Sequence, residues 1–167
     1  GSKIPVLPNR LNTFLDDCLN LFIFYRKYCK RNYLELIDNT GHKAMKVPMI
    51  HGSFIFSKFN IFKKLGFFYP NTFLFAEERF IAFRVKKMNF NNYILLDQVY
   101  IHEHSKTINR TFGSLKKYRL LYDSWIEFTR VYRSHAKIKV LILKLLILIS
   151  LLELSLVNIF FKAFKTK

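Results

Sequence analysis

The sequence contains few of the residues that would indicate a disulfide framework or a zinc site. Its 167 residues include only two cysteines, Cys18 and Cys29, and no CxxC pair or Cys/His cluster. On a single helix these two thiols would lie about 16 Å apart, too far for a disulfide. We interpret them as buried free thiols of a cytoplasmic protein. No signal-peptide pattern, internal repeat or low-complexity linker is visible.

Acidic residues are also scarce, with 11 Asp and Glu against 28 Lys and Arg, for a net charge of +17. Residues 106–167 carry 13 basic and 3 acidic side chains, so 10 of the 17 net charges lie there. The same stretch is the most apolar part of the chain. This combination indicates an anionic membrane surface as a partner, and no motif supports nucleic-acid binding.

Hydrophobic residues make up 51% of the chain, which excludes disorder throughout and suffices for a packed core. We predict an α+β fold with a short mixed sheet and a helical C-terminal extension. The expected parts are a helical lead-in over 1–46, a core over 47–111 and a basic, apolar tail over 112–167. Periodicity and turn signals predict the following elements: helices over 11–37, 57–65, 76–88, 112–135 and 137–164, and strands over 47–56 and 93–101. Asn12 or Thr13 is the expected cap of the first helix, and Ser57 is the expected cap of the second. Gly66 is the expected stop of the second helix, and a loop is expected over 67–72.

Residues 51–107 hold the most informative series of motifs. In chain order they are His51-Gly52-Ser53, Leu65-Gly66-Phe67-Phe68, Phe73-Leu74-Phe75-Ala76-Glu77-Glu78, Arg84, and His102-Glu103-His104-Ser105. In this order and spacing they resemble the acceptor-side, C-terminal half of family 2 glycosyltransferases of the GT-A fold. Those enzymes have a Gly-Ser strand, a short helix ending in a Gly-Phe turn, an aromatic segment before an acidic pair, a helical Arg and a strand ending in His.

The resemblance implies a partial GT-A-like domain that transfers a sugar from a nucleotide-sugar donor to a surface-glycan or lipid-linked acceptor. It implies a peripheral location at the cytoplasmic face of the cell membrane. It also implies a divalent cation, Mn²⁺ or Mg²⁺, in the complete enzyme. The family's donor half carries an Asp-x-Asp motif, which this sequence lacks. We therefore expect the chain alone to be inactive and to need a missing N-terminal half, or to act as a homo-oligomer.

The acidic pair is the candidate catalytic group. A carboxylate at a helix N-terminus is well placed to take the proton of an acceptor hydroxyl. The family pattern maps the base onto Glu78, with Glu77 orienting the loop or touching the acceptor, because adjacent helical residues point about 100° apart. The alternative is that both residues only complement the helix dipole.

Each of the other candidate residues has two interpretations, a contact with the substrate and a purely structural role. Gly52 and Ser53 bring backbone near the substrate or form a strand bulge. Phe73 and Phe75 form a sugar-stacking wall or pack in the core. Arg84 reaches a phosphate, a carboxylate or a neighbouring loop.

His102 and His104 project to one face of a strand end. The family places a histidine near the diphosphate and metal, and His102 fits that position best, so it is the candidate metal contact. The alternative is a pair of surface histidines, since two His without a carboxylate make a poor metal site.

The tail is rich in Leu, Ile, Val and Phe, interrupted by Lys139, Lys144 and Glu153. A membrane-spanning helix needs about 20 mostly uncharged residues. The expected polar stripe is Lys137, Lys144, Ser155, Asn158 and Lys162. We interpret the tail as an interfacial helix, with packing against another domain or in a dimer as alternatives. A non-catalytic membrane-binding or scaffolding module, and a basic nucleic-acid-binding protein, are the alternative functions.

Overall fold

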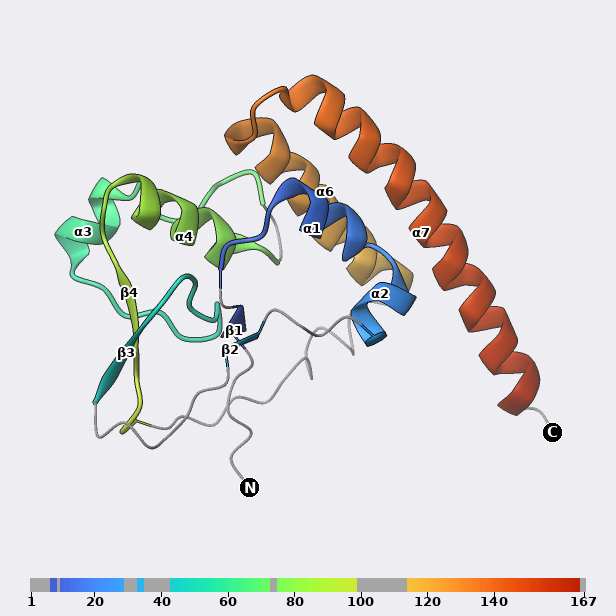
Figure 1. Cartoon of the computed structure of the whole chain (residues 1–167), viewed down its shortest axis with the longest axis horizontal. Helices are drawn as coiled ribbons and strands as arrows, with labels where there is room; N and C mark the ends of the chain where they lie inside the picture. The colour runs from blue at the N-terminus through green and yellow to red at the C-terminus, as the bar shows by residue number, and fades with distance from the viewer. Residues whose placement is uncertain are drawn as a thin grey trace. The chain divides into compact units, whose positions relative to one another are not determined.

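The computed structural model describes residues 7–8, 10–28, 33–34, 43–72, 75–98 and 114–165 (Figure 1). In these ranges the chain is α+β, with six helices and two antiparallel strand pairs, which confirms the predicted class. It divides into two compact units. One unit contains residues 1–11 and 31–106, and the other contains 12–30 and 107–167. Residues 12–30, expected in the lead-in segment, therefore group with the C-terminal helices.

The first unit contains both strand pairs. β1 (Leu7–Pro8) pairs with β2 (Tyr33–Leu34), and β3 (Ala44–Val47) pairs with β4 (Asn92–Leu95). Both described ladders are antiparallel, in place of the expected mixed sheet. The strand predicted over 47–56 lies earlier in the chain, because Pro48 has no N–H to continue the ladder.

Two helices complete the described part of this unit, α3 (Phe59–Lys64) and α4 (Glu77–Lys87). The predicted glycine stop is confirmed, since Gly66 has a φ of 79° immediately after the C-cap of α3. The predicted Ser57 cap is wrong by one residue. Lys58 occupies the N-cap position, with no side-chain cap, and the Ser57 hydroxyl contacts the Lys58 carbonyl instead. The two helices share a buried apolar cluster of Leu65, Ile81 and Val85.

The second unit is helical, with α1 (Phe14–Leu19), α2 (Ile23–Tyr28), α6 (Ser114–Tyr132) and α7 (Ala136–Lys165). Helices α6 and α7 form a hairpin (Figure 1). Thr13 is confirmed as the cap of α1: its hydroxyl accepts from the Asp16 N–H at 3.2 Å, and its own N–H donates to Asp16 Oδ2 at 2.6 Å. The core gathers Leu21 from the turn between α1 and α2, Tyr122 from α6 and Leu143 from α7.

The single helix predicted over 11–37 is wrong, because the chain breaks between α1 and α2. Tyr122 Oη and Ser150 Oγ donate to the Leu21 carbonyl at 3.2 and 2.7 Å. The Ile23 N–H donates to Glu153 Oε2 at 3.1 Å. Side chains of α6 and α7 thus replace the hydrogen bonds that a continuous helix would make. Ser150 and Glu153, polar residues within the most apolar helix, are explained by this contact.

The buried free thiol is confirmed for Cys18, where burial raises the pKa of the thiol. The separation of the two thiols expected on one continuous helix does not apply, because the chain breaks between α1 and α2. Cys29 itself lies outside the described residues.

Candidate functional site

The acidic pair Glu77-Glu78 forms the first two residues of α4. The two residues before it, Phe75 and Ala76, have φ values of 68° and 63°. Positive φ is costly for residues with a Cβ, and such strain is concentrated at functional sites. Two consecutive left-handed residues turn the chain abruptly into the helix. This turn fixes the direction in which the two carboxylates leave the backbone.

Both carboxylates converge on the turn at Gly52. A Cβ added to Gly52 would lie 3.0 Å from Glu78 Oε2 and 3.7 Å from Glu77 Oε1. A contact of 3.0 Å is tighter than most contacts of a Cβ, so a side chain at this position would require the Glu78 carboxylate to shift, and glycine permits the close approach without that shift. Although adjacent helical residues point about 100° apart, both carboxyl groups lie close to the turn at Gly52, and only Glu77 is among the residues that line the pocket beside it. The bend of the backbone before α4 and the length of the Glu side chain bring both carboxyl groups to this turn.

The two carboxyl groups have unusual environments. Burial raises the pKa of Glu78 above its ordinary value, and the negative charge of Glu77 adds to this increase. The backbone N–H of Glu78 and the positive charge of Arg79 act in the opposite direction. Glu77 Oε2 is buried and has no hydrogen-bond partner among the residues that the structure describes. A carboxylate with a raised pKa beside a second, unsatisfied one suits proton transfer.

A pocket of about 290 Å³ adjoins this pair and is lined by Gly52, Phe68, Tyr69, Thr72 and Glu77. Its volume is at the lower end of the range for small-molecule sites. The Tyr69 ring stacks on the buried Phe80 ring with centroids 4.5 Å apart. The Thr72 hydroxyl donates to the Tyr69 carbonyl at 3.0 Å. These contacts give the pocket a fixed aromatic wall and a fixed hydroxyl.

Sequence reasoning did not identify Phe68, Tyr69 and Thr72 as pocket residues. The Phe-Phe-Tyr-Pro segment in the expected loop over 67–72 was the available signal, because an aromatic-rich loop beside an acidic pair is typical of a binding wall.

Arg84 is fixed by the neighbouring loop, one of the alternatives left open above. Its Nη1 lies 2.9, 3.2 and 2.9 Å from the carbonyl oxygens of Leu65, Gly66 and Phe67. These carbonyls belong to the C-cap of α3 and to the two residues that follow it. Arg84 therefore holds the turn that leads into the pocket wall at Phe68.

Of the remaining candidate residues, the structure describes Ser53 and Phe75. Ser53 Oγ lies 2.7 Å from His51 Nδ1, and the Ser53 N–H donates to the same nitrogen at 3.3 Å. Phe75 is half-buried. Phe73, His102 and His104 lie outside the described residues, so their predicted roles stay predictions.

The divalent cation that the resemblance implies belongs to the complete enzyme, and its main ligands are not expected in this chain. In the ranges that the structure covers, no group of three or more His, Cys, Asp or Glu side chains is arranged to hold a metal ion. We derive no step through a metal bound by these residues.

Comparison of the chain with protein-family models, with curated proteins and with solved structures gave no match. The geometry of the site therefore carries the functional argument.

The raised pKa of Glu78 predicts a pH-dependent cost to folding. In the pH range between its unfolded and folded pKa values the folded state binds more protons, so stability falls as pH rises through this range. We expect Glu78→Gln to raise the melting temperature at neutral pH and to leave it unchanged near pH 4. Thermal unfolding of both proteins from pH 4 to pH 8 measures this, with Glu127→Gln on α6 as the control. A Glu78→Gln protein that is less stable than the wild type at neutral pH would contradict the prediction.

Proposed function

We propose that the chain supplies the acceptor side and the catalytic base of a glycosyltransferase similar to family 2 enzymes, within a partial GT-A-like domain. The observation that carries the proposal is the convergence of Glu77 and Glu78 on Gly52 beside a small aromatic-walled pocket. The raised pKa of Glu78 supports its role as the proton acceptor. Glu77, which lines the pocket, would hold a second acceptor hydroxyl.

In the proposed reaction, Glu78 takes the proton of the acceptor hydroxyl as the oxygen forms a bond to the anomeric carbon of the donor sugar. The bond between that carbon and the nucleoside diphosphate breaks, and the diphosphate leaves with the electron pair. Phe68 and Tyr69 offer apolar faces against which a sugar ring can stack. The donor would be bound by a donor-binding half, supplied in the same polypeptide or as a separate one.

The test is a transfer assay in which a donor-binding half is supplied and wild type, Glu78→Gln and Glu77→Gln are compared. Activity that both substitutions leave unchanged would exclude this site as the catalytic centre.

A second candidate function, a membrane-binding module, is favoured by the free face of α7. Residues 136–157 are long and apolar enough to cross a membrane by length and composition. Among the side chains of α7 that the structure describes, nine aliphatic ones are exposed: Ile138, Leu141, Ile142, Leu145, Leu148, Ile149, Leu152, Leu156 and Ile159. Lys137 and Lys144, at one border of this face, are also exposed. The opposite face packs within the unit through Leu143, Ile147 and Ser150, so an arrangement along the membrane surface fits α7 better than a span.

We expect Leu145→Ser combined with Leu152→Ser to weaken binding to vesicles containing anionic lipid by at least about tenfold, because two exposed leucines would leave the lipid. The matched control is Leu95→Ser combined with Leu115→Ser, which removes two exposed leucines from β4 and α6. Deletion of α7 would be a poor test, since it would also uncover the core around Tyr122. Equal binding of the two double variants would show that α7 does not contact lipid.

A further inference from the structure

The α3 region carries an exposed aromatic surface that the proposed chemistry does not use. Five phenylalanines there are exposed: Phe54, Phe56, Phe59, Phe67 and Phe68. Phe56 is 89% exposed and Phe59 is 68% exposed. Large aromatic side chains normally lose most of their contact with water on folding. A cluster of this kind marks a surface that meets an apolar partner.

Three of these rings, Phe59, Phe67 and Phe68, form a connected group with Phe62. Phe62 contacts Phe67 and Phe68 edge to face, with centroids 5.5 and 5.2 Å apart, and Phe59 lies 6.0 Å from Phe67. On its inner side α3 packs through Ile61, Phe62 and Leu65 against α4. The inner side of the cluster thus packs on the core of its own unit, and its outer side is exposed and can contact a partner.

The charged side chains of the segment that carries the cluster, between Pro48 and Ala76, are all basic, and the acidic pair Glu77-Glu78 follows this segment directly. Lys58, Lys63 and Lys64 are exposed next to these rings. The chain contains no Asp or Glu between Pro48 and Ala76. Aromatic rings combined with lysines that reach outward are typical of a surface that inserts at the headgroup level of an anionic bilayer. A protein partner would have to supply both an apolar face and carboxylates in matching positions, whereas an anionic lipid surface supplies both at once.

The aromatic surface is continuous with the candidate site. Phe68 contacts Phe62 within the cluster and also lines the pocket beside Glu77. Arg84 donates hydrogen bonds to carbonyls of the Leu65–Phe67 turn, which connects α3 to Phe68 at the pocket. A molecule that reaches the pocket along Phe68 would therefore arrive from the level of the aromatic rings.

We propose that the surface formed by Phe56, Phe59, Phe67, Lys63 and Lys64 docks on an anionic lipid bilayer and that the acceptor is an amphiphile held in that bilayer. The proposal that this surface docks on a bilayer depends only on the surface itself. The proposal about the class of acceptor rests on the proposed function. Docking at α3 brings the mouth of the pocket to headgroup level, where the hydroxyl of a lipid-linked acceptor lies.

The test places a fluorescent reporter on the surface in the full-length chain. Trp125 is the only tryptophan, so Phe59→Trp in a Trp125→Phe background reports on α3 alone, whatever α7 does. We expect a blue shift of emission, and quenching by brominated lipid, on adding vesicles that contain phosphatidylglycerol. The control is Tyr93→Trp in the same background, on an exposed position of β4, where no change is expected. An unchanged α3 reporter in vesicle-bound protein would overturn the docking.

A charge test complements the reporter. Lys63→Glu with Lys64→Glu should weaken vesicle binding at least about tenfold more than Lys43→Glu with Lys46→Glu, because both pairs change the net charge equally but only the first lies beside the rings. A reporter shift produced by a single-stranded oligonucleotide and not by vesicles would identify a nucleic-acid surface and overturn the proposal. A shift that follows protein concentration without vesicles would identify self-association, with the same consequence.

The acceptor class is tested in the transfer assay, by comparing a lipid-linked acceptor in vesicles with its water-soluble headgroup. The inference would be supported if the wild type prefers the lipid-linked acceptor and Phe59→Ser abolishes this preference. Equal use of both would overturn it and leave the proposed function intact. No transfer to either acceptor, with the reporter shift present, would reject the proposed function and the acceptor class together, and leave the docking.

Discussion

Glu78→Gln is expected to lower the rate of sugar transfer by about 10²–10⁴-fold, because the amide keeps the size of the side chain but cannot take a proton. The loss should appear in kcat, while the KM for the donor changes little, since this pocket belongs to the acceptor side. For the wild type, kcat should rise with pH as Glu78 ionises, and the midpoint should lie above the ordinary pKa of a glutamate, because burial raises the pKa of Glu78.

Glu77→Gln is the internal control for this assignment. Glu77 lines the pocket, so its substitution should mainly raise the KM for the acceptor. If Glu78→Gln retains near-normal turnover while Glu77→Gln loses it, the base is Glu77. If neither loses turnover and each costs only about 0.3–1 kcal/mol of stability, the pair serves the helix dipole and is not catalytic. Circular dichroism and thermal unfolding of both variants separate lost chemistry from lost folding.

Sequence reasoning was reliable for most features that local signals determine, with the Ser57 cap as the exception. The glycine stop at Gly66, the Thr13 cap and the helix that begins after Ala76 all depend on neighbouring residues, and each is confirmed. These features are encoded within one or two turns of chain, so a single sequence is enough to predict them.

The failures have tertiary causes. Helical periodicity from Leu11 onward gave no sign of a break, because the break is stabilised by Tyr122, Ser150 and Glu153, more than a hundred residues away. The convergence of both glutamates on Gly52 was missed for a similar reason, since it requires two segments 25 residues apart to meet. The prediction for Glu77 and Glu78 used the geometry of an ideal helix. It did not account for the sharp turn of the backbone just before the helix, where Phe75 and Ala76 have positive φ.

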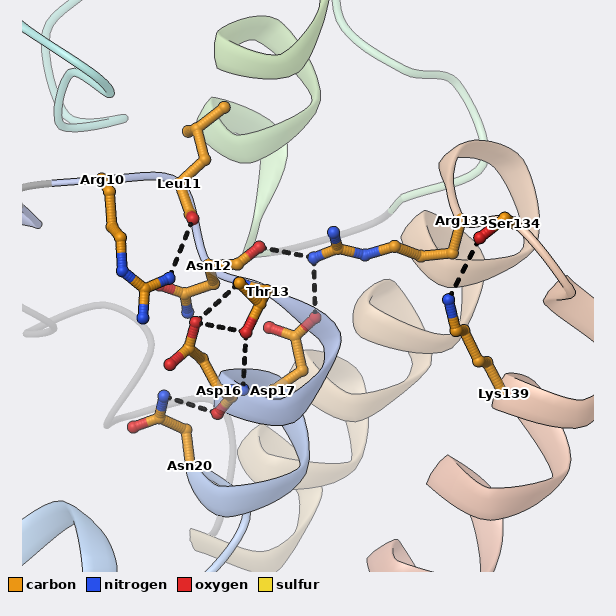
Figure 2. Close-up of polar contacts among 10 residues, drawn as sticks. All are labelled: Arg10, Leu11, Asn12, Thr13, Asp16, Asp17, Asn20, Arg133, Ser134 and Lys139. Atoms are coloured by element: carbon orange, nitrogen blue, oxygen red, sulfur yellow. Dashed lines mark hydrogen bonds and ion pairs between the residues drawn. The ribbon is translucent and has the colours of Figure 1, made fainter.

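Breaking the buried ion pair of the helical unit should cost a large share of the stability of that unit. Arg133 Nη2 donates to Asp17 Oδ2 at 3.2 Å and to the Asn12 carbonyl at 2.5 Å (Figure 2). The Asp17 side chain is 1% exposed and that of Arg133 is 17% exposed. Through these contacts the residue after α6 is tied to the start of α1. The arginine also lies over the Phe128 ring, 5.4 Å from its centroid.

Arg133→Met should lower the free energy of unfolding by about 3–5 kcal/mol, because it keeps the apolar stem but removes the positive charge beside a buried carboxylate. This is a large part of the roughly 5–15 kcal/mol that stabilises a typical domain. The matched control is Arg130→Met, which breaks an exposed pair with Glu127 one turn earlier and should cost at most about 1 kcal/mol. Adding Asp17→Asn to Arg133→Met should recover part of the loss, because an amide is less costly to bury than a carboxylate that has lost its cation. Urea unfolding of the four proteins measures these differences, and equal losses from Arg133→Met and Arg130→Met would show that the contact with Asp17 does not stabilise the unit.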